Sequence, residues 1–139
     1  MSDANKSIVR RWFDEIYTKK RLELMDELHA AAYTWRGPSG VTVTSRDGMR
    51  ELLGVYFSAF PDLHFTVEEQ MSEGDQVVTR WSARGTHSGE FDGIAPTGSS
   101  IVFTGITISR LENGRLVEEW ESFDELLLMR QIGAVPTAD

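Results

Sequence analysis

The chain has 139 residues and a formal net charge of −8, from 14 Lys and Arg against 22 Asp and Glu. This length fits one domain over residues 1–139, and 40% hydrophobic with 26% charged residues is a globular composition that excludes a disordered chain. The acidic balance has the wrong sign for neutralising phosphates, so we expect no nucleic-acid partner. Because the sequence has no cysteine, thiolate metal ligands and disulfides are excluded as well.

The sequence carries no signal for a membrane or for export. The first six residues are polar and lack the apolar core of a signal peptide. No apolar run approaches the ~20 residues that cross a bilayer. We therefore expect a cytoplasmic protein with no membrane partner.

The first half of the chain is predicted to be mainly helical. Apolar side chains recur at helical spacing in three segments, residues 4–18, 22–28 and 49–60. The third segment ends at Pro61, because a residue that precedes proline is pushed out of the helical region. Between the second and third segments, aromatic residues alternate with polar ones in Tyr33-Thr34-Trp35-Arg36, which predicts a short strand.

After Leu63 the apolar period changes to two, which is typical of half-buried strands. We predict strands over residues 63–71, 76–87, 101–111 and 115–123. The dipeptide Asn113-Gly114 favours a two-residue hairpin turn between the last two strands. The segment 88–100 is rich in glycine and contains Pro96, so it is the best candidate for a mobile lid. A short helix is expected over residues 124–132, closed by Gly133.

Helices followed by hairpin-linked strands indicate an α+β fold. We expect three N-terminal helices packed on a curved, mainly antiparallel sheet, with a short C-terminal helix. Helices on the concave side of such a sheet would leave a cone lined by aromatic side chains, which suits a hydrophobic small molecule. The residues expected to bind that ligand are Trp35, Tyr33, Trp81, Trp120 and Phe57, although aromatic residues at alternating strand positions more often belong to the core.

The motifs of several common enzyme chemistries are missing. The sequence has no nucleophile elbow, zinc-protease helix, P-loop or dinucleotide-binding glycine motif. The histidines lie in different elements, so we expect no metal site. Asp62 is expected to make the turn after the third helix, and it is also a candidate for ligand binding.

The remaining chemistry is acid–base catalysis in an apolar pocket. Counting back from Asp124 places Trp120, Glu118 and Leu116 on one strand face, so the carboxylate of Asp124 would lie beyond the Trp120 ring, with a raised pKa. Asp124 equally suits the N-cap of the following helix. His87 ends a strand where the glycine-rich segment begins, and it could assist as a proton donor or orienting group. A histidine at a loop entrance is somewhat more often held there by a hydrogen bond without any role in catalysis. The glutamates of the last strand, Glu118, Glu119 and Glu121, are expected to form a solvated edge unless one points inward.

Three ordered motifs resemble the SnoaL-like polyketide cyclase family, which has the NTF2-like cone fold. They are Ala59-Phe60-Pro61-Asp62-Leu63-His64, Gly85-Thr86-His87-Ser88-Gly89-Glu90-Phe91, and Asn113-Gly114-Arg115-Leu116-Val117-Glu118-Glu119-Trp120 followed by Asp124. The resemblance implies an intramolecular aldol-type ring closure of a polyketide ester without metal or cofactor. It also implies an acid/base aspartate at Asp124. A histidine of the family would fall near Arg110, so this chain lacks that partner.

Three functional hypotheses follow. The first is a cyclase-type enzyme with Asp124 as acid/base and His87 assisting. The second is a non-catalytic module for small-molecule binding or dimerisation. The third is an isomerase or hydrolase, for which a further polar residue such as Tyr17, Tyr33 or Tyr56 should lie beside the acid/base group. A homodimer is expected because Val102, Ile106 and Ile108 would expose apolar area on the outer sheet face.

Overall fold

A computed structural model describes residues 2–134. Its elements are α1 (Ser2–Arg11), η1 (Trp12–Thr18), η2 (Leu22–Leu24), α2 (Met25–Leu28), β1 (His29–Arg36), η3 (Pro38–Gly40), β2 (Thr42–Val43), α3 (Arg46–Ala59), β3 (His64–Glu73), β4 (Gln76–Thr86), β5 (Ser100–Glu112), β6 (Arg115–Phe123) and α4 (Glu125–Gln131). The helices and strands expected from the sequence are therefore present. The α+β class is confirmed.

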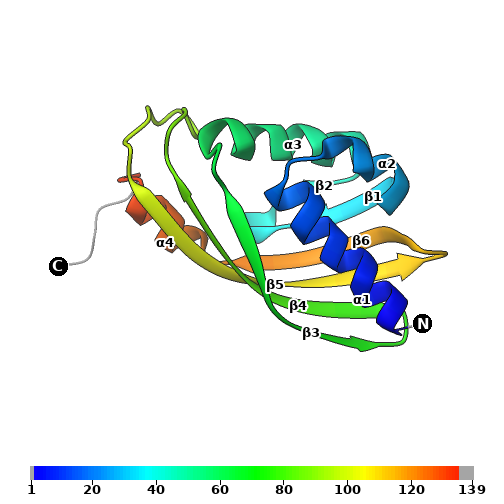
Figure 1. Ribbon diagram of the computed structural model, residues 1–139. Coiled ribbons are helices and arrows are strands. Elements are labelled where there is room, and N and C mark those ends of the chain that lie inside the picture. Colours follow the sequence, from blue (N-terminus) through cyan, green and yellow to red (C-terminus); the bar gives the residue numbers. More distant parts are fainter. Residues whose placement is uncertain (1, 135–139) are drawn as a thin grey trace.

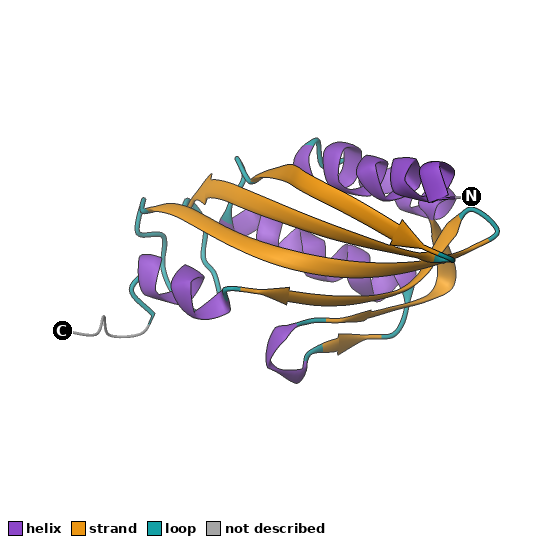
Figure 2. Ribbon diagram, turned by 90° about the horizontal axis from the view of Figure 1, so that it is seen from below, coloured by secondary structure: helices purple, strands orange, loops and turns teal. Residues whose placement is uncertain are grey.

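Six strands form one curved sheet in the order β2-β1-β6-β5-β4-β3. Strands β6, β5, β4 and β3 pair antiparallel, whereas β1 runs parallel to β6. Helices α1 and α3 cover the concave face, and α4 lies at one end of the sheet (Figure 1). Seen from below, the convex face carries no helix of the described chain (Figure 2). The core, and any ligand site within it, must therefore lie between the sheet and α1 and α3.

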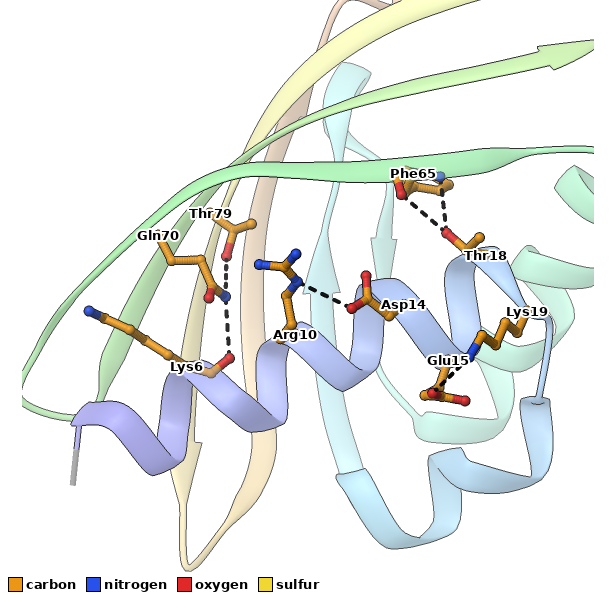
Figure 3. Close-up of polar contacts among 9 residues, drawn as sticks. All are labelled: Lys6, Arg10, Asp14, Glu15, Thr18, Lys19, Phe65, Gln70 and Thr79. Atoms are coloured by element: carbon orange, nitrogen blue, oxygen red, sulfur yellow. Dashed lines mark hydrogen bonds and ion pairs between the residues drawn. The ribbon is translucent and has the colours of Figure 1, made fainter.

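The first helix changes its winding where it meets the core. After α1 the chain continues as the π-helical turn η1, which buries Trp12, Phe13, Ile16 and Tyr17. A π-turn brings residues five apart in sequence above one another, and the rings of Trp12 and Tyr17 accordingly lie with centroids 4.3 Å apart. Figure 3 shows the polar contacts that tie this helix to β3 and β4, including the Thr18 hydroxyl on the backbone of Phe65.

Two β-bulges set which side chains face the core. In β6 the register steps from Leu116 to Glu118 while β5 advances by one residue, so Val117 is the extra residue. In β3 the same shift makes Glu68 the extra residue. Beyond each bulge the alternation inverts. As a result Met71, which the simple alternation predicts to face inward, is 58% exposed.

The local turn predictions agree with the structure. Asn113 and Gly114 both have positive φ, as the predicted hairpin turn requires. Gly133 also has positive φ at the end of α4. The segment 88–99 is a loop, and backbone hydrogen bonds join its base to the carbonyl of Ala59. Its proposed role as a lid stays a prediction.

Candidate active site

An apolar cavity lies between α3, η1 and the concave face of the sheet. It holds about 440 Å³ of space free of atoms, including the part that opens to solvent. Its walls come from the helices, from β1 and from the four long strands. The lining residues are Tyr17, Trp35, Met49, Leu52, Leu53, Tyr56, Phe57, Leu63, Phe65, Trp81, Phe103, Glu121 and Phe123. Three of the aromatic residues predicted to bind a ligand, Trp35, Trp81 and Phe57, are thus brought together.

Glu121 is the only ionisable carboxyl group in this lining. The Thr107 hydroxyl donates to its Oε1 at 2.8 Å, and the Trp81 indole N–H donates to the Thr107 oxygen at 2.9 Å. Two effects together raise the pKa of Glu121 to about 8. The larger is the removal of the carboxylate from water, and the smaller is the negative charge of Glu119. A carboxyl group with this pKa can both accept and return a proton near neutral pH.

Two further polar groups of the lining have no partner. The Tyr17 hydroxyl and the Trp35 indole N–H are buried and make no hydrogen bond within residues 2–134. The Trp35 N–H lies close enough to Glu121 to lower the pKa of that carboxyl, although it falls short of hydrogen-bond geometry. Burial and the nearby Glu121 and Glu119 hold the pKa of Tyr17 well above its usual value, so its hydroxyl stays protonated.

A second carboxyl group, the fully buried Glu119, lies next to the cavity on the same face of β6 as Glu121. It accepts hydrogen bonds from the Trp12 indole N–H at 2.9 Å and from the hydroxyls of Tyr33 and Ser109. Burial raises its pKa to about 7, while these three donors lower it in part. The neighbouring His29 stays neutral because burial lowers its pKa to about 3. His29 therefore supplies no positive charge near Glu119.

The two carboxyl groups form a ladder with hydroxyls of β5. Ser109 pairs with Glu119 in the strand register, and Thr107 pairs with Glu121. Each glutamate accepts a hydrogen bond from the hydroxyl opposite to it. Two carboxyl groups close together in a poorly hydrated site disfavour double ionisation, so their proton affinities are linked. The arrangement can supply one base and one acid near pH 7.

Asp124 and Trp120 do not face the cavity. This corrects the prediction that both side chains lie on the cavity side of the last strand. Trp120 is 36% exposed on the convex side, where the Arg36 guanidinium lies over its ring. Asp124 is exposed and accepts a hydrogen bond from the Leu127 backbone N–H at 3.0 Å, as an N-cap does. The count from Leu116 fails because the bulge at Val117 inverts the alternation. Of the two alternatives left open for Asp124, its contacts match the cap.

The other predicted site residues lie outside the lining. His87 is buried at the start of the loop, where its Nδ1 lies 2.9 Å from the Thr97 hydroxyl. Asp62 accepts hydrogen bonds from the backbone N–H and the hydroxyl of Thr86, so it holds the turn after α3 against the end of β4. Tyr33 is buried and donates to Glu119 rather than bordering the cavity.

Sequence reasoning missed Glu119 and Glu121 as site residues, because glutamates on a terminal strand are mostly solvated. The available signal was the pair Thr107 and Ser109 on the facing strand, since hydroxyls at alternate positions can satisfy two inward carboxyl groups. To use this signal, one must know that the pairing of β5 with β6 shifts at Val117, because that shift places Ser109 opposite Glu119 and Thr107 opposite Glu121.

Neither a metal cluster nor a membrane helix is found in the described part of the chain. No group of three His, Asp or Glu side chains there could hold a metal ion. No helix among residues 2–134 is long and apolar enough to cross a bilayer.

Solved structures of several proteins resemble this one over almost their whole length. A candidate SnoaL-like polyketide cyclase from Jannaschia sp. CCS1 has 27% identity and a TM-score of 0.88, with 96% of this chain and 94% of the other covered. IdmH, a candidate polyketide cyclase from Streptomyces antibioticus, has 31% identity and a TM-score of 0.82, with 93% and 98% covered. AclR, a candidate hydroxylase from Streptomyces galilaeus, has 26% identity and a TM-score of 0.85, with 97% and 84% covered.

No curated protein matches the sequence closely enough to count as a relative. The sequence pattern of the SnoaL-like polyketide cyclases, by contrast, matches residues 7–132. That match includes every strand and all the residues of the cavity. The chain therefore belongs to the SnoaL-like polyketide cyclase family.

Proposed function

We propose that this protein catalyses a cofactor-free acid–base reaction on a largely apolar carbonyl compound, with Glu121 as the acid/base group. The reaction class is an intramolecular aldol-type ring closure, in line with the family and with the names of two related structures. The observation that carries the proposal is the single carboxyl group with a pKa of about 8 inside an aromatic cavity.

The proposed reaction balances without any other reagent. The Glu121 carboxylate takes a proton from a carbon activated by adjacent carbonyls, and the resulting enolate attacks a second carbonyl carbon of the same molecule. A carbon–carbon bond forms as the π bond of that carbonyl breaks. The alkoxide produced then takes the proton back from Glu121, so the product is an isomer of the substrate. Such acid–base assistance contributes about 10²–10⁴-fold to a rate.

The resemblance implies Asp124 as acid/base group with His87 assisting, and this alternative can be tested alongside Glu121. The position of Asp124 argues against it, because this carboxylate is exposed, caps α4 and lies outside the lining of the cavity. The test is exchange of the activated methylene protons of an aromatic ketoester with deuterium, followed by NMR. Glu121→Gln should lose most of the catalysed exchange, and Asp124→Asn should keep it.

The matched control is Glu118→Gln, because Glu118 lies on the same strand but pairs with Arg36 and Arg110 on the convex side. It should leave the exchange rate unchanged. Loss of exchange in Asp124→Asn together with full exchange in Glu121→Gln would refute the role of Glu121. Binding of the ketoester without any exchange in the native protein would favour the non-catalytic module instead.

An isomerase is the second candidate function. It requires polar groups beside the acid/base group, and the cavity lining includes the two tyrosines Tyr17 and Tyr56 as well as Glu121. An isomerase would move a proton between two carbons of the same substrate without closing a ring. Product analysis by mass and NMR distinguishes a shifted double bond from a new ring.

A homodimer through the convex sheet face is part of the proposal. Val102 is 55% exposed and Ile106 49% exposed on this face, where Ile108 and Trp120 are each 36% exposed. A small monomer seldom exposes contiguous apolar area of this kind. Light scattering should give twice the chain mass, and Ile106→Glu should reduce it to the mass of one chain.

A further inference from the structure

We infer that the Tyr17 hydroxyl and the Trp35 indole N–H form a binding site for the oxygen of a ketone beside Glu121. The inference rests on the proposed function, because it names the group of the substrate that this cavity would recognise. It predicts a flat, apolar ligand with an enolisable ketone whose oxygen accepts two hydrogen bonds.

The first support is that both donors are buried without a partner. Tyr17 is 3% exposed and Trp35 4% exposed, and neither polar atom has an acceptor in the described structure. Most buried polar groups in folded proteins are paired, and an unpaired one is costly. A ligand oxygen that accepts both hydrogen bonds would recover that cost.

The second support is that the Tyr17 ring is fixed by its neighbours. It stacks on Phe65 at 4.7 Å between ring centroids, and it packs against Trp12 at 4.3 Å and Phe13 at 5.0 Å. These rings belong to η1 and β3, so the hydroxyl is held from two elements. A donor fixed in advance stabilises developing negative charge without having to reorient.

Trp35 is constrained in a comparable way. Its six-membered ring lies against Gly37, where a Cβ atom would come within 2.1 Å of the ring. The residue pairs with Val43 on one side and Glu119 on the other in the strand register. The indole therefore borders the cavity with its N–H near Glu121.

The third support is the chemistry of the combination. When Glu121 takes a proton from the carbon next to a ketone, negative charge moves onto the ketone oxygen. Two neutral donors at that oxygen would stabilise the enolate more than the ketone, which is how such groups accelerate a reaction. The hydroxyl of Tyr17 stays protonated because burial and the nearby glutamates raise its pKa. The aromatic walls Phe65, Trp81, Phe103 and Phe123 suit a planar ring system.

The test compares two ligands of the same shape, 2-acetylnaphthalene and 2-ethylnaphthalene, of which only the first has a carbonyl oxygen. The native protein should bind the ketone about tenfold more tightly, as two net hydrogen bonds provide. The infrared carbonyl band of the bound, ¹³C-labelled ketone should lie below its frequency in an apolar solvent. Tyr17→Phe and Trp35→Phe should each reduce the preference for the ketone and raise the band.

The matched control is Trp120→Phe, because Trp120 lies on the convex face outside the cavity. It should keep the ketone preference and the band position, and circular dichroism should show that every variant is folded. Equal affinity for the two ligands, an unchanged band in Tyr17→Phe and Trp35→Phe, or no binding of either ligand would overturn the inference.

The Glu121→Gln variant separates this inference from the proposed function. It should lose deuterium exchange but keep the low carbonyl band. If exchange survives in Glu121→Gln while the band depends on Tyr17, the acid/base assignment fails and the oxygen site stands. If exchange needs Glu121 while the band ignores Tyr17 and Trp35, the reverse holds.

Discussion

Replacing Glu119 by Gln should lower the pKa of Glu121. The two carboxyl groups are two residues apart on one face of β6, which places them about 7 Å apart along a strand. At an effective dielectric constant of about 20, two unit charges at that distance repel by roughly 2 kcal/mol. That energy corresponds to between one and two pKa units, at about 1.36 kcal/mol each. The pKa of Glu121 should therefore fall from about 8 toward about 6–7.

The assay is a carboxyl NMR titration of ¹³C-labelled protein, with Glu121→Gln for assignment. Glu118→Gln is the control, because it removes a carboxylate from the same strand on the opposite face. It should leave the titration of Glu121 where it was. An unchanged titration of Glu121 in Glu119→Gln would refute the linkage between the two groups.

Glu119 should also make stability depend on pH. Its pKa is about 7 in the fold against an ordinary 4.5, so the folded protein holds the proton more strongly than the unfolded chain. The resulting contribution is complete below about pH 4.5 and is lost as the pH rises through 7. Between pH 5 and 8 it should cost about 2–3 kcal/mol of unfolding free energy. Glu119→Gln should show a correspondingly smaller loss in urea titrations at the two pH values.

Three further predictions concern the frame of the site. Asp62→Ala should destabilise the fold by about 1–2 kcal/mol at pH 7, measured by urea unfolding. The loss should be smaller at pH 3. The hydrogen bonds from Thr86 lower the pKa of Asp62, so the stability that this carboxylate contributes disappears when it is protonated. Gly105→Ala should destabilise the fold by more than about 1 kcal/mol, because a Cβ atom at this position would lie 2.3 Å from the Trp81 ring. Calorimetry measures the effect, and an unaltered melting temperature would contradict this packing. Asp124→Ala should cost about 1 kcal/mol in urea unfolding as a lost N-cap, and equal stability would argue against the cap.

The fold was predictable because its signals are local. The period of the apolar residues changes once, near Leu63, and the Asn113-Gly114 turn fixes the last hairpin. The π-helical winding of η1 carried no such signal, because the same apolar residues suit an ordinary helix. The parallel pairing of β1 with β6 depends on the assembled sheet and not on either strand alone.

The site was predictable only in part. Trp35, Trp81 and Phe57 line the cavity as expected, because large aromatic residues turn toward the core. The predicted position of Trp120 and Asp124 on the cavity side was wrong because one bulge residue, Val117, exchanges the two faces of β6. Buried glutamates are rare, and two of the donors to Glu119, Trp12 and Tyr33, come from distant segments of the chain. A local sequence pattern cannot show that these donors converge.

The parallel pairing of β1 with β6 also decides when the site can assemble during folding. Trp12 and Glu119 are 107 residues apart in the chain, and Tyr33 and Glu119 are 86 apart. Closing such long loops is slow, and the entropy it costs must be met before the contacts can compensate it. The hairpins β3–β4 and β5–β6 each have a two-residue turn, so these two pairs of strands can form while β1 is still unattached. We therefore expect the burial of Glu119, which needs Trp12 and Tyr33 in place, to follow the pairing of β5 with β6 during folding.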